Sequence, residues 1–244
     1  MGREATEVMT GEEWERRGES LQETRRQVGE VRERLLKLCA QMPRTIDDLR
    51  QEIGCGRSEI YRHVAKAIDF GLLERNDQLR GLPALLLATR EGHEFARSGL
   101  APQRISPGAF QHFVACSQVT AQLRARYPNA RLISDAELRR WELDEDRAVA
   151  SAEIGLLPSG AARLHRPDMV LLPEGQLPTA IEVELTPKAP DRLRTIVKAW
   201  RRTRCIRQVI YLCSEEAHGA VERAAEHLHF GADNVVIRRL ERVA

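Results

Sequence analysis

The chain has 244 residues, of which 42% are hydrophobic and 30% charged, and its formal net charge is +2. Such a small net charge excludes affinity for nucleic acid through overall charge, so any such affinity must come from local patches. No positively charged, then apolar leader opens the chain and no apolar run approaches membrane length, so we expect a cytoplasmic protein that does not enter a membrane.

The cysteines form neither a CxxC pair nor a zinc-finger spacing, and their number is odd, which favours reduced thiols in a cytosol. They are Cys39, Cys55, Cys116, Cys205 and Cys213.

Residues 1–30 are highly charged, and apolar residues recur every seven positions from Trp14 through Leu21 and Val28 to Leu35. This thin seam predicts a helical arm, and two interpretations stay open for it. One is a solvated helix with frayed ends, which we favour for residues 1–11. The other is an arm that dimerises or packs on the following domain.

Residues 31–100 predict a compact run of short elements. In chain order we expect a helix from Val31 to about Gln41, a helix over Ile46–Ile53 capped by Thr45, a tight turn at Gly54–Gly56, a helix over Arg57–Phe70, a strand starting at Leu72, a polar turn, a strand over Ala84–Thr89, and a helix over Glu91–Ser98.

This order of elements resembles the winged helix-turn-helix fold. The resemblance implies that the third helix enters the major groove of double-stranded DNA, with flanking basic residues on the phosphates. The residues expected to face DNA are Arg57, Ser58, Tyr61, Arg62, Lys66, Arg75 and Arg80. Two alternatives remain open: winged helices also dock proteins, and Glu59 beside Arg62 is typical of an ordinary intrahelical ion pair.

Residues 101–108 contain Pro102, Pro107 and Gly108 and predict a linker, after which the chain reads as an α/β domain over residues 109–244. His112, near the start of the first helix, is interpreted as a core or interface residue. The expected elements are a helix over Ala109–Tyr127, a strand over Arg131–Ser134, a helix capped by Ser134, an insertion over Leu143–His165, strands over Met169–Pro173 and Thr179–Thr186, a helix after Pro190, a strand over Gln208–Ser214, a helix over His218–Phe230 and a strand over Asn234–Arg239.

Three carboxylates, Asp168, Glu182 and Glu184, fall on the two neighbouring strands Met169–Pro173 and Thr179–Thr186 or at their ends. If the strands pair, these groups converge at one end of a sheet, where they repel one another unless a hard cation bridges them or water screens them. The functional interpretation is a Mg²⁺ site that activates water on a phosphodiester. The simpler interpretation is a strand with one solvated face.

The order Pro167-Asp168, then Glu182-Val183-Glu184, then a basic helix resembles the PD-(D/E)xK nuclease core. That resemblance implies that Asp168 and Glu182 ligate metal. Glu184 stands where the motif carries its Lys, and Lys198 in the next helix is a substitute for it, a phosphate contact or a solvated side chain.

Residues 31–240 together resemble the replication-relaxation family of bacterial plasmids and integrating elements, which pairs a winged helix with a degenerate nuclease-like domain. The residues that carry the resemblance are His112, Asp168, Glu182, Glu184 and Lys198, with aromatic Trp200 after the last. It implies a DNA-binding protein that controls plasmid replication, transfer or transcription. It also implies a possible homodimer and other plasmid replication or transfer proteins as partners.

A rival hypothesis is a Mg²⁺-dependent endonuclease in which Asp168 and Glu182 hold the metal and Glu184 and Lys198 act in catalysis. A third is an adaptor whose winged helix docks a protein.

Overall fold

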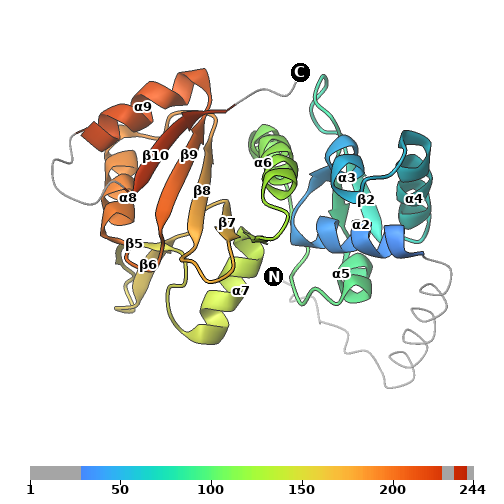
Figure 1. Cartoon of the computed structure of the whole chain (residues 1–244), viewed down its shortest axis with the longest axis horizontal. Helices are drawn as coiled ribbons and strands as arrows, with labels where there is room; N and C mark the ends of the chain where they lie inside the picture. The colour runs from blue at the N-terminus through green and yellow to red at the C-terminus, as the bar shows by residue number, and fades with distance from the viewer. Residues whose placement is uncertain (1–28, 227–233, 241–244) are drawn as a thin grey trace, which may run out of the picture.

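The computed structural model describes residues 29–226 and 234–240, and shows a mixed α/β protein (Figure 1). From residue 29 onward, the N-terminal unit contains four helices and a small sheet of strand order β1-β3-β2. Its elements are α2 (Glu30–Gln41), β1 (Arg44–Thr45), α3 (Ile46–Ile53), α4 (Arg57–Asp69), β2 (Leu73–Asn76), β3 (Leu85–Ala88) and α5 (Arg90–Ala96). The predicted arm, apart from residues 29 and 30, lies outside the described residues.

The C-terminal unit is built on a larger sheet of strand order β10-β9-β8-β7-β4, beside the hairpin β5-β6. Its elements are α6 (Pro107–Arg126), β4 (Arg131–Ser134), α7 (Asp135–Glu145), β5 (Ala152–Leu156), β6 (Ala162–His165), β7 (Met169–Leu172), β8 (Thr179–Glu184), α8 (Pro190–Arg202), β9 (Gln208–Cys213), α9 (Glu215–Glu226) and β10 (Val235–Arg239).

Local sequence signals explain the short helices of the N-terminal unit. Thr45 caps α3, since its hydroxyl accepts a hydrogen bond from the amide of Asp48 at 3.2 Å, and Gly54 ends α3 in the left-handed conformation at φ 76°. Gly92 in α5 lies against the carbonyl of Leu72, where a Cβ atom would come within 2.0 Å of the oxygen. Glycine is therefore required at the point where α5 meets the start of the β2–β3 hairpin.

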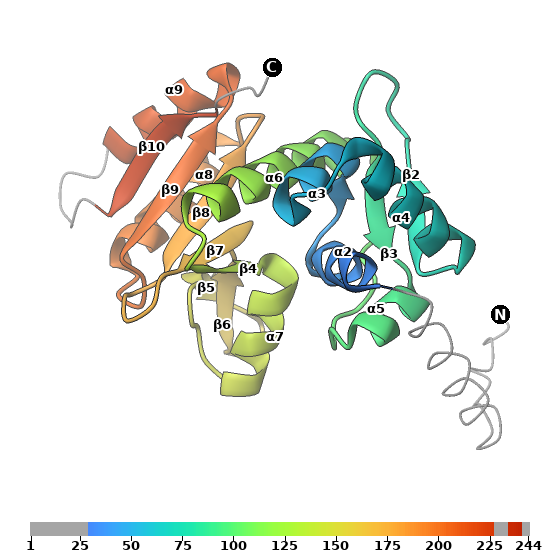
Figure 2. The same cartoon turned by 45° about the vertical axis from the view of Figure 1, so that its right-hand side comes forward.

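The larger sheet is covered on both faces. Strands β8, β9 and β10 run parallel, β7 is antiparallel to β8, and β4 is antiparallel to β7. One face packs against α8 and α9, in an apolar cluster that includes Trp200 of α8. The other face packs against α6 (Figure 1, Figure 2). Because β8 lies in the middle, all six of its residues are buried.

Helix α6 is shared between the two units. Toward the small sheet, its residues Phe110 and Val114 form an apolar cluster with Leu85 and Leu87 of β3. Other α6 residues pack on the larger sheet: Ala115, Cys116 and Val119 join Met169, Ile181 and Val183. The view in Figure 2 shows α6 running between the sheet and the N-terminal helices.

A buried polar network strengthens this junction. Arg44 of β1 is 1% exposed; it forms an ion pair with Glu52 of α3 and donates to the Ser117 carbonyl of α6 at 3.1 Å. Glu52 also pairs with Arg124 of α6 at 3.0 Å, and the Ser117 hydroxyl donates to Asp48 at 2.6 Å. Charged and polar groups of β1, α3 and α6, most of them buried, thus link the two units.

The stretch Leu143–His165, expected as an insertion, contains the end of α7 and the β5–β6 hairpin, which packs against α8. One sequence expectation is wrong. Glu182 and Glu184 do not form a solvated face, since their exposed fractions are 3% and 4%. Among the helices of the described residues, none has the length and apolar character needed to cross a membrane.

Candidate functional site

The buried carboxylate of Glu142 fixes the segment that leads to Asp168. Glu142 of α7 accepts a hydrogen bond from the side chain of Arg166 at 2.9 Å and from the backbone amides of Val149 at 3.0 Å and Ala150 at 3.4 Å. With Arg166 fixed, the chain enters β7 with Asp168 at its start. The register pairs Met169 of β7 with Ile181 of β8, so Asp168 lies beside the end of the β8 strand that carries Glu182.

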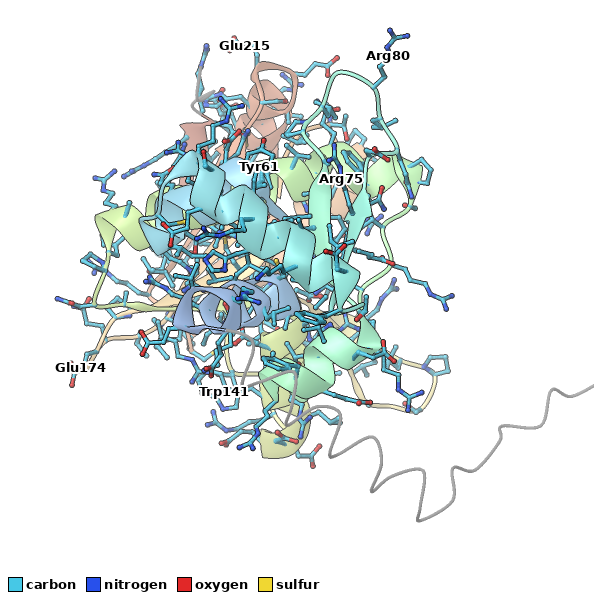
Figure 3. All side chains as sticks on the ribbon, turned by 90° about the vertical axis from the view of Figure 1, so that its right-hand side faces the viewer. Tyr61, Arg75, Arg80, Trp141, Glu174 and Glu215 are labelled. Atoms are coloured by element: carbon cyan, nitrogen blue, oxygen red, sulfur yellow. The ribbon has the colours of Figure 1, made fainter. Side chains whose placement is uncertain are left out.

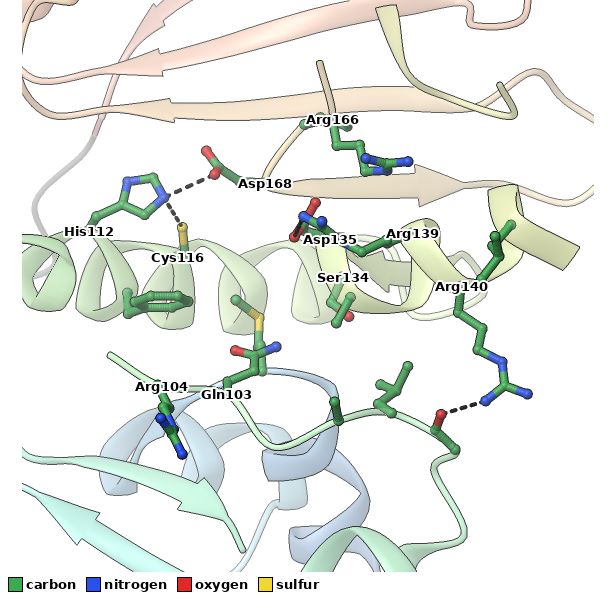
Figure 4. A pocket seen from close by; sticks show the side chains of 18 residues that line it. Gln103, Arg104, His112, Cys116, Ser134, Asp135, Arg139, Arg140, Arg166 and Asp168 are labelled. Atoms are coloured by element: carbon green, nitrogen blue, oxygen red, sulfur yellow. Dashed lines mark hydrogen bonds and ion pairs between the residues drawn. The ribbon is translucent and has the colours of Figure 1, made fainter. Parts of the chain in front are cut away.

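Asp168 contacts groups on two elements. One carboxylate oxygen lies 2.9 Å from Nε2 of His112 on α6, and the other accepts the backbone amide of Val183 at 2.7 Å. Cys116, one turn after His112 on α6, places its Sγ 3.4 Å from the same Nε2 atom. His112, Cys116 and Asp168 therefore converge on one point where α6 meets the start of β7 (Figure 4).

Glu182 makes its hydrogen bonds on the face of the sheet that packs against α8, opposite the face that packs against α6. Its Oε1 lies 2.7 Å from Nε2 of His165, the last residue of β6, and accepts the indole N–H of Trp200 at 3.2 Å. The rings of His165 and Trp200 meet edge to face with centroids 5.9 Å apart. The hairpin and α8 thus close over Glu182.

The two residues predicted to act in catalysis, Glu184 and Lys198, have different surroundings. Glu184 is buried and forms an ion pair with Lys188, four residues on. Lys198 lies on the exposed side of α8 and lines a separate cavity with Glu153 and Arg202. The charges of Asp168 and Glu182 therefore affect each other across the sheet, while Lys198 lines a different cavity.

Burial dominates the electrostatics of the site. It raises the pKa of Glu182. The hydrogen bond and charge of His165 act against this rise, and the charge of Asp168 adds to it. Burial also raises the pKa of the Cys116 thiol well above its usual value, and Asp168 and Glu182 add to this rise. Burial alone would lower the pKa of His112, but the hydrogen bond and charge of Asp168 outweigh it and raise that pKa.

A cavity of about 640 Å³ opens beside His112, Cys116 and Asp168, between the C-terminal unit and the segment 99–104. Figure 4 shows this cavity with the labelled side chains around it. Its charged lining residues are Arg104, Asp135, Arg139, Arg140, Arg166 and Asp168. Arginine thus outnumbers acid around the opening.

The predicted DNA-contacting residues gather on another surface. All seven, on α4 and the β2–β3 hairpin, are exposed, while Ile60, Val64 and Ala67 of α4 face the core. Figure 3 shows Tyr61 on α4 and Arg75 and Arg80 on the adjacent hairpin. The guanidinium of Arg57 lies 5.9 Å from the ring of Tyr61, so the two side chains share one face at the start of α4.

Sequence reasoning missed three residues of the site. Cys116 follows His112 by four positions, a helical spacing that indicates a shared face, and Lys188 follows Glu184 by the same interval. His165 gave no comparable signal, because its contact with Glu182 depends on a hairpin that the sequence pattern did not predict.

Compared with models of protein families and with curated proteins, the chain matches none.

Proposed function

We propose that this chain is a DNA-binding protein of a mobile genetic element. In this proposal residues 31–100 act as a winged helix that reads double-stranded DNA, and residues 109–244 are a nuclease-like domain that holds DNA or partners without cutting. The proposed role in plasmid replication, transfer or transcription rests on the sequence resemblance to the replication-relaxation family.

The observation that carries the proposal is the polar face of α4. Arg57, Ser58, Tyr61, Arg62 and Lys66 are all exposed along it, next to a hairpin that carries Arg75 and Arg80. In a winged helix the corresponding helix lies in the major groove, with its N-terminal residues on the base edges and the hairpin on the backbone. The bidentate geometry of Arg suits guanine, and the hydroxyl groups suit phosphate.

The burial and the existing contacts of Glu182 support a domain that does not cleave DNA. A Mg²⁺ ion in a nuclease needs carboxylate oxygens that it can reach together with several water molecules. Here Glu182 is 3% exposed and already holds His165 and Trp200, while Asp168 holds His112 and the Val183 amide. Metal binding by both carboxylates would require these contacts to break.

Electrophoretic mobility shift tests the DNA surface. The probes are a duplex of the chain's own upstream region and an unrelated duplex of equal length. Loss of both guanidinium groups in Arg57→Ala plus Arg62→Ala should weaken binding to the specific duplex at least about tenfold, since a good base contact contributes about 1–3 kcal/mol. Each lost phosphate contact should also lower the slope of log affinity against log salt by about one unit.

A matched control removes the same charge elsewhere. Lys37→Ala plus Arg90→Ala changes two exposed basic residues of α2 and α5, outside α4 and the hairpin, and should leave the specific affinity within about threefold of wild type. Equal losses in both double variants, or none in either, would reject α4 as the recognition helix. Absence of any shift at low salt, with a protein that co-purifies, would instead indicate the adaptor function.

One observation favours a second candidate, a Mg²⁺-dependent endonuclease: Asp168 and Glu182 lie at the same end of paired strands, with their charges close enough to affect each other. This function predicts nicking of supercoiled plasmid with Mg²⁺ or Mn²⁺, abolished by Asp168→Asn. Activity that survives this substitution would come from a contaminant, and no nicking across several DNA substrates would reject the candidate.

A further inference from the structure

Helix α6 presents a nitrogen and a sulfur ligand on one face. His112 and Cys116 are four residues apart, so their side chains project in the same direction. Asp168 reaches the same point from the start of β7, and one ligand atom from each residue lies within 4.8 Å of the other two. Figure 4 shows the three side chains meeting at the wall of the cavity.

The contacts within this group do not fit a thiol nucleophile with a histidine base. In such a relay the thiol and the carboxylate contact opposite nitrogen atoms of the imidazole ring. Here Cys116 Sγ and Asp168 Oδ1 both lie next to the same atom, Nε2 of His112, at 3.4 Å and 2.9 Å. This convergence of three ligand atoms on one point matches the arrangement of ligands around a metal ion.

We propose that Nε2 of His112, Sγ of Cys116 and Oδ1 of Asp168 bind a divalent transition-metal ion of the zinc class, with a fourth position open to the cavity. Imidazole, thiolate and carboxylate are the three ligand types that zinc uses in proteins, and three protein ligands with an open fourth position are typical of its reactive sites. This site is separate from the proposed DNA surface and uses no part of it.

The distances fit such an ion with small adjustments. Bonds of about 2.0–2.3 Å in tetrahedral geometry put neighbouring ligand atoms about 3.3–3.7 Å apart. The measured separation from Nε2 to Sγ lies in this range, and the separation from Nε2 to Oδ1 is shorter by a few tenths of an ångström. A modest change in side-chain torsion angles would therefore admit the ion.

The surroundings orient the ligands and leave a path to solvent. The Val183 amide holds the second oxygen of Asp168, which turns Oδ1 toward His112, as outer hydrogen bonds do for metal-binding carboxylates. The side chains of His112 and Asp168 are 34% and 24% exposed, so an ion can enter from the cavity, whereas Cys116 is buried behind them. The open position faces the cavity, which has room for a water molecule as the fourth ligand.

Cobalt substitution tests the site with the full-length chain. After treatment with a chelator, one equivalent of Co²⁺ should give a thiolate-to-cobalt charge-transfer band and visible bands with the intensity of four-coordinate cobalt. Zn²⁺ should displace the cobalt with a stoichiometry of one ion per chain. Cys116→Ser should remove the charge-transfer band, and His112→Gln and Asp168→Asn should lower the affinity more than about 100-fold, because loss of an outer-shell partner alone costs 10–100-fold.

The control is Cys55→Ser, which removes a half-buried thiol of the N-terminal unit and should leave the cobalt spectrum unchanged. Circular dichroism verifies that each variant is folded, and His112→Gln, at a partly exposed position, keeps the test valid if the buried Cys116→Ser variant does not fold. Absence of a charge-transfer band in the wild-type protein would overturn the proposal. So would a band that persists in Cys116→Ser, or an unchanged affinity in His112→Gln.

Discussion

The ion pair between Arg44 and Glu52 allows a quantitative test of how the two units are joined. Their side chains are 1% and 2% exposed, so Glu52→Gln leaves the Arg44 guanidinium buried without the carboxylate that pairs with it. Removing one partner of a buried ion pair costs about 3–5 kcal/mol. We expect the lower end, about 3 kcal/mol, because the charge of Asp48 also stabilises Arg44 and Ser117 still accepts one of its N–H groups.

Arg124, the second partner of Glu52, should add little to this loss. It is 32% exposed and keeps a hydrogen bond to Gln41 at 2.6 Å, so water and Gln41 can satisfy it. For a chain of this length, a loss of 3 kcal/mol lowers Tm by about 6–12 °C. Thermal and urea denaturation followed by circular dichroism measure this change.

Two further variants separate the buried charge from other effects. Arg44→Met plus Glu52→Leu removes both charges and should cost less than the single Glu52→Gln change, because the fully buried guanidinium is removed together with its partner. Asp48 keeps the hydroxyl groups of Thr45 and Ser117, Arg124 keeps Gln41, and the Ser117 carbonyl loses its donor. Lys37→Gln breaks an ion pair whose side chains are 57% and 54% exposed and should cost less than about 0.5 kcal/mol. If Glu52→Gln costs as little as Lys37→Gln, the buried pair does not stabilise the junction and the reasoning is wrong.

Two other predictions concern the N-terminal unit. Gly92→Ala should destabilise the protein by about 1–3 kcal/mol, because the new Cβ would collide with the Leu72 carbonyl. Gly108→Ala, in α6, is the control: its Cβ would have no atom within 4 Å, so the change should be neutral or slightly stabilising. Equal Tm values for the two variants would contradict this. His63 should make stability fall as pH drops below about 6.5, because burial and then the neighbouring Arg32 lower its pKa in the folded state, so that the unfolded chain binds more protons. His63→Asn retains an acceptor for the Arg32 N–H and should remove this contribution, so its stability to urea should fall less than that of wild type between pH 7 and pH 5.5. His93, whose pKa is also lowered, and His112, whose pKa is raised, titrate in both proteins and cancel from the comparison. An equal or larger fall in stability in His63→Asn would show the sign to be wrong.

Elements with strong local signals were predicted with the bounds that the structure has. Helix α3 spans Ile46–Ile53 as expected, because Thr45 caps its start and Gly54 ends it. Helix α8 buries the predicted residues Leu193, Ile196, Val197 and Trp200, since a single apolar stripe at helical spacing admits one orientation. In such segments local chemistry and tertiary packing favour the same conformation.

The environment of the candidate site could not be predicted in this way. The alternation of Glu182 and Glu184 with apolar residues is typical of a half-solvated strand, but β8 is central and covered on both faces. The acids are tolerated there because each has a partner: His165 and Trp200 for Glu182, and Lys188 for Glu184. His165 and Trp200 come from elements separated from Glu182 in sequence, so only the assembled sheet shows that these acids are buried.

Helix α6, which follows the predicted linker at residues 101–108, packs against both units. One set of its side chains completes the apolar cluster under β3, another covers the larger sheet, and Ser117 and Arg124 join the ionic network of β1 and α3. A chain cut before α6 would leave Leu85 and Leu87 uncovered and Glu52 without Arg124. The residues of the candidate metal site, His112 and Cys116, lie on this same helix, so their position relative to Asp168 depends on packing from both units. The coil at residues 101–106 therefore separates two sheets in sequence, while the core around α6 holds them together in space.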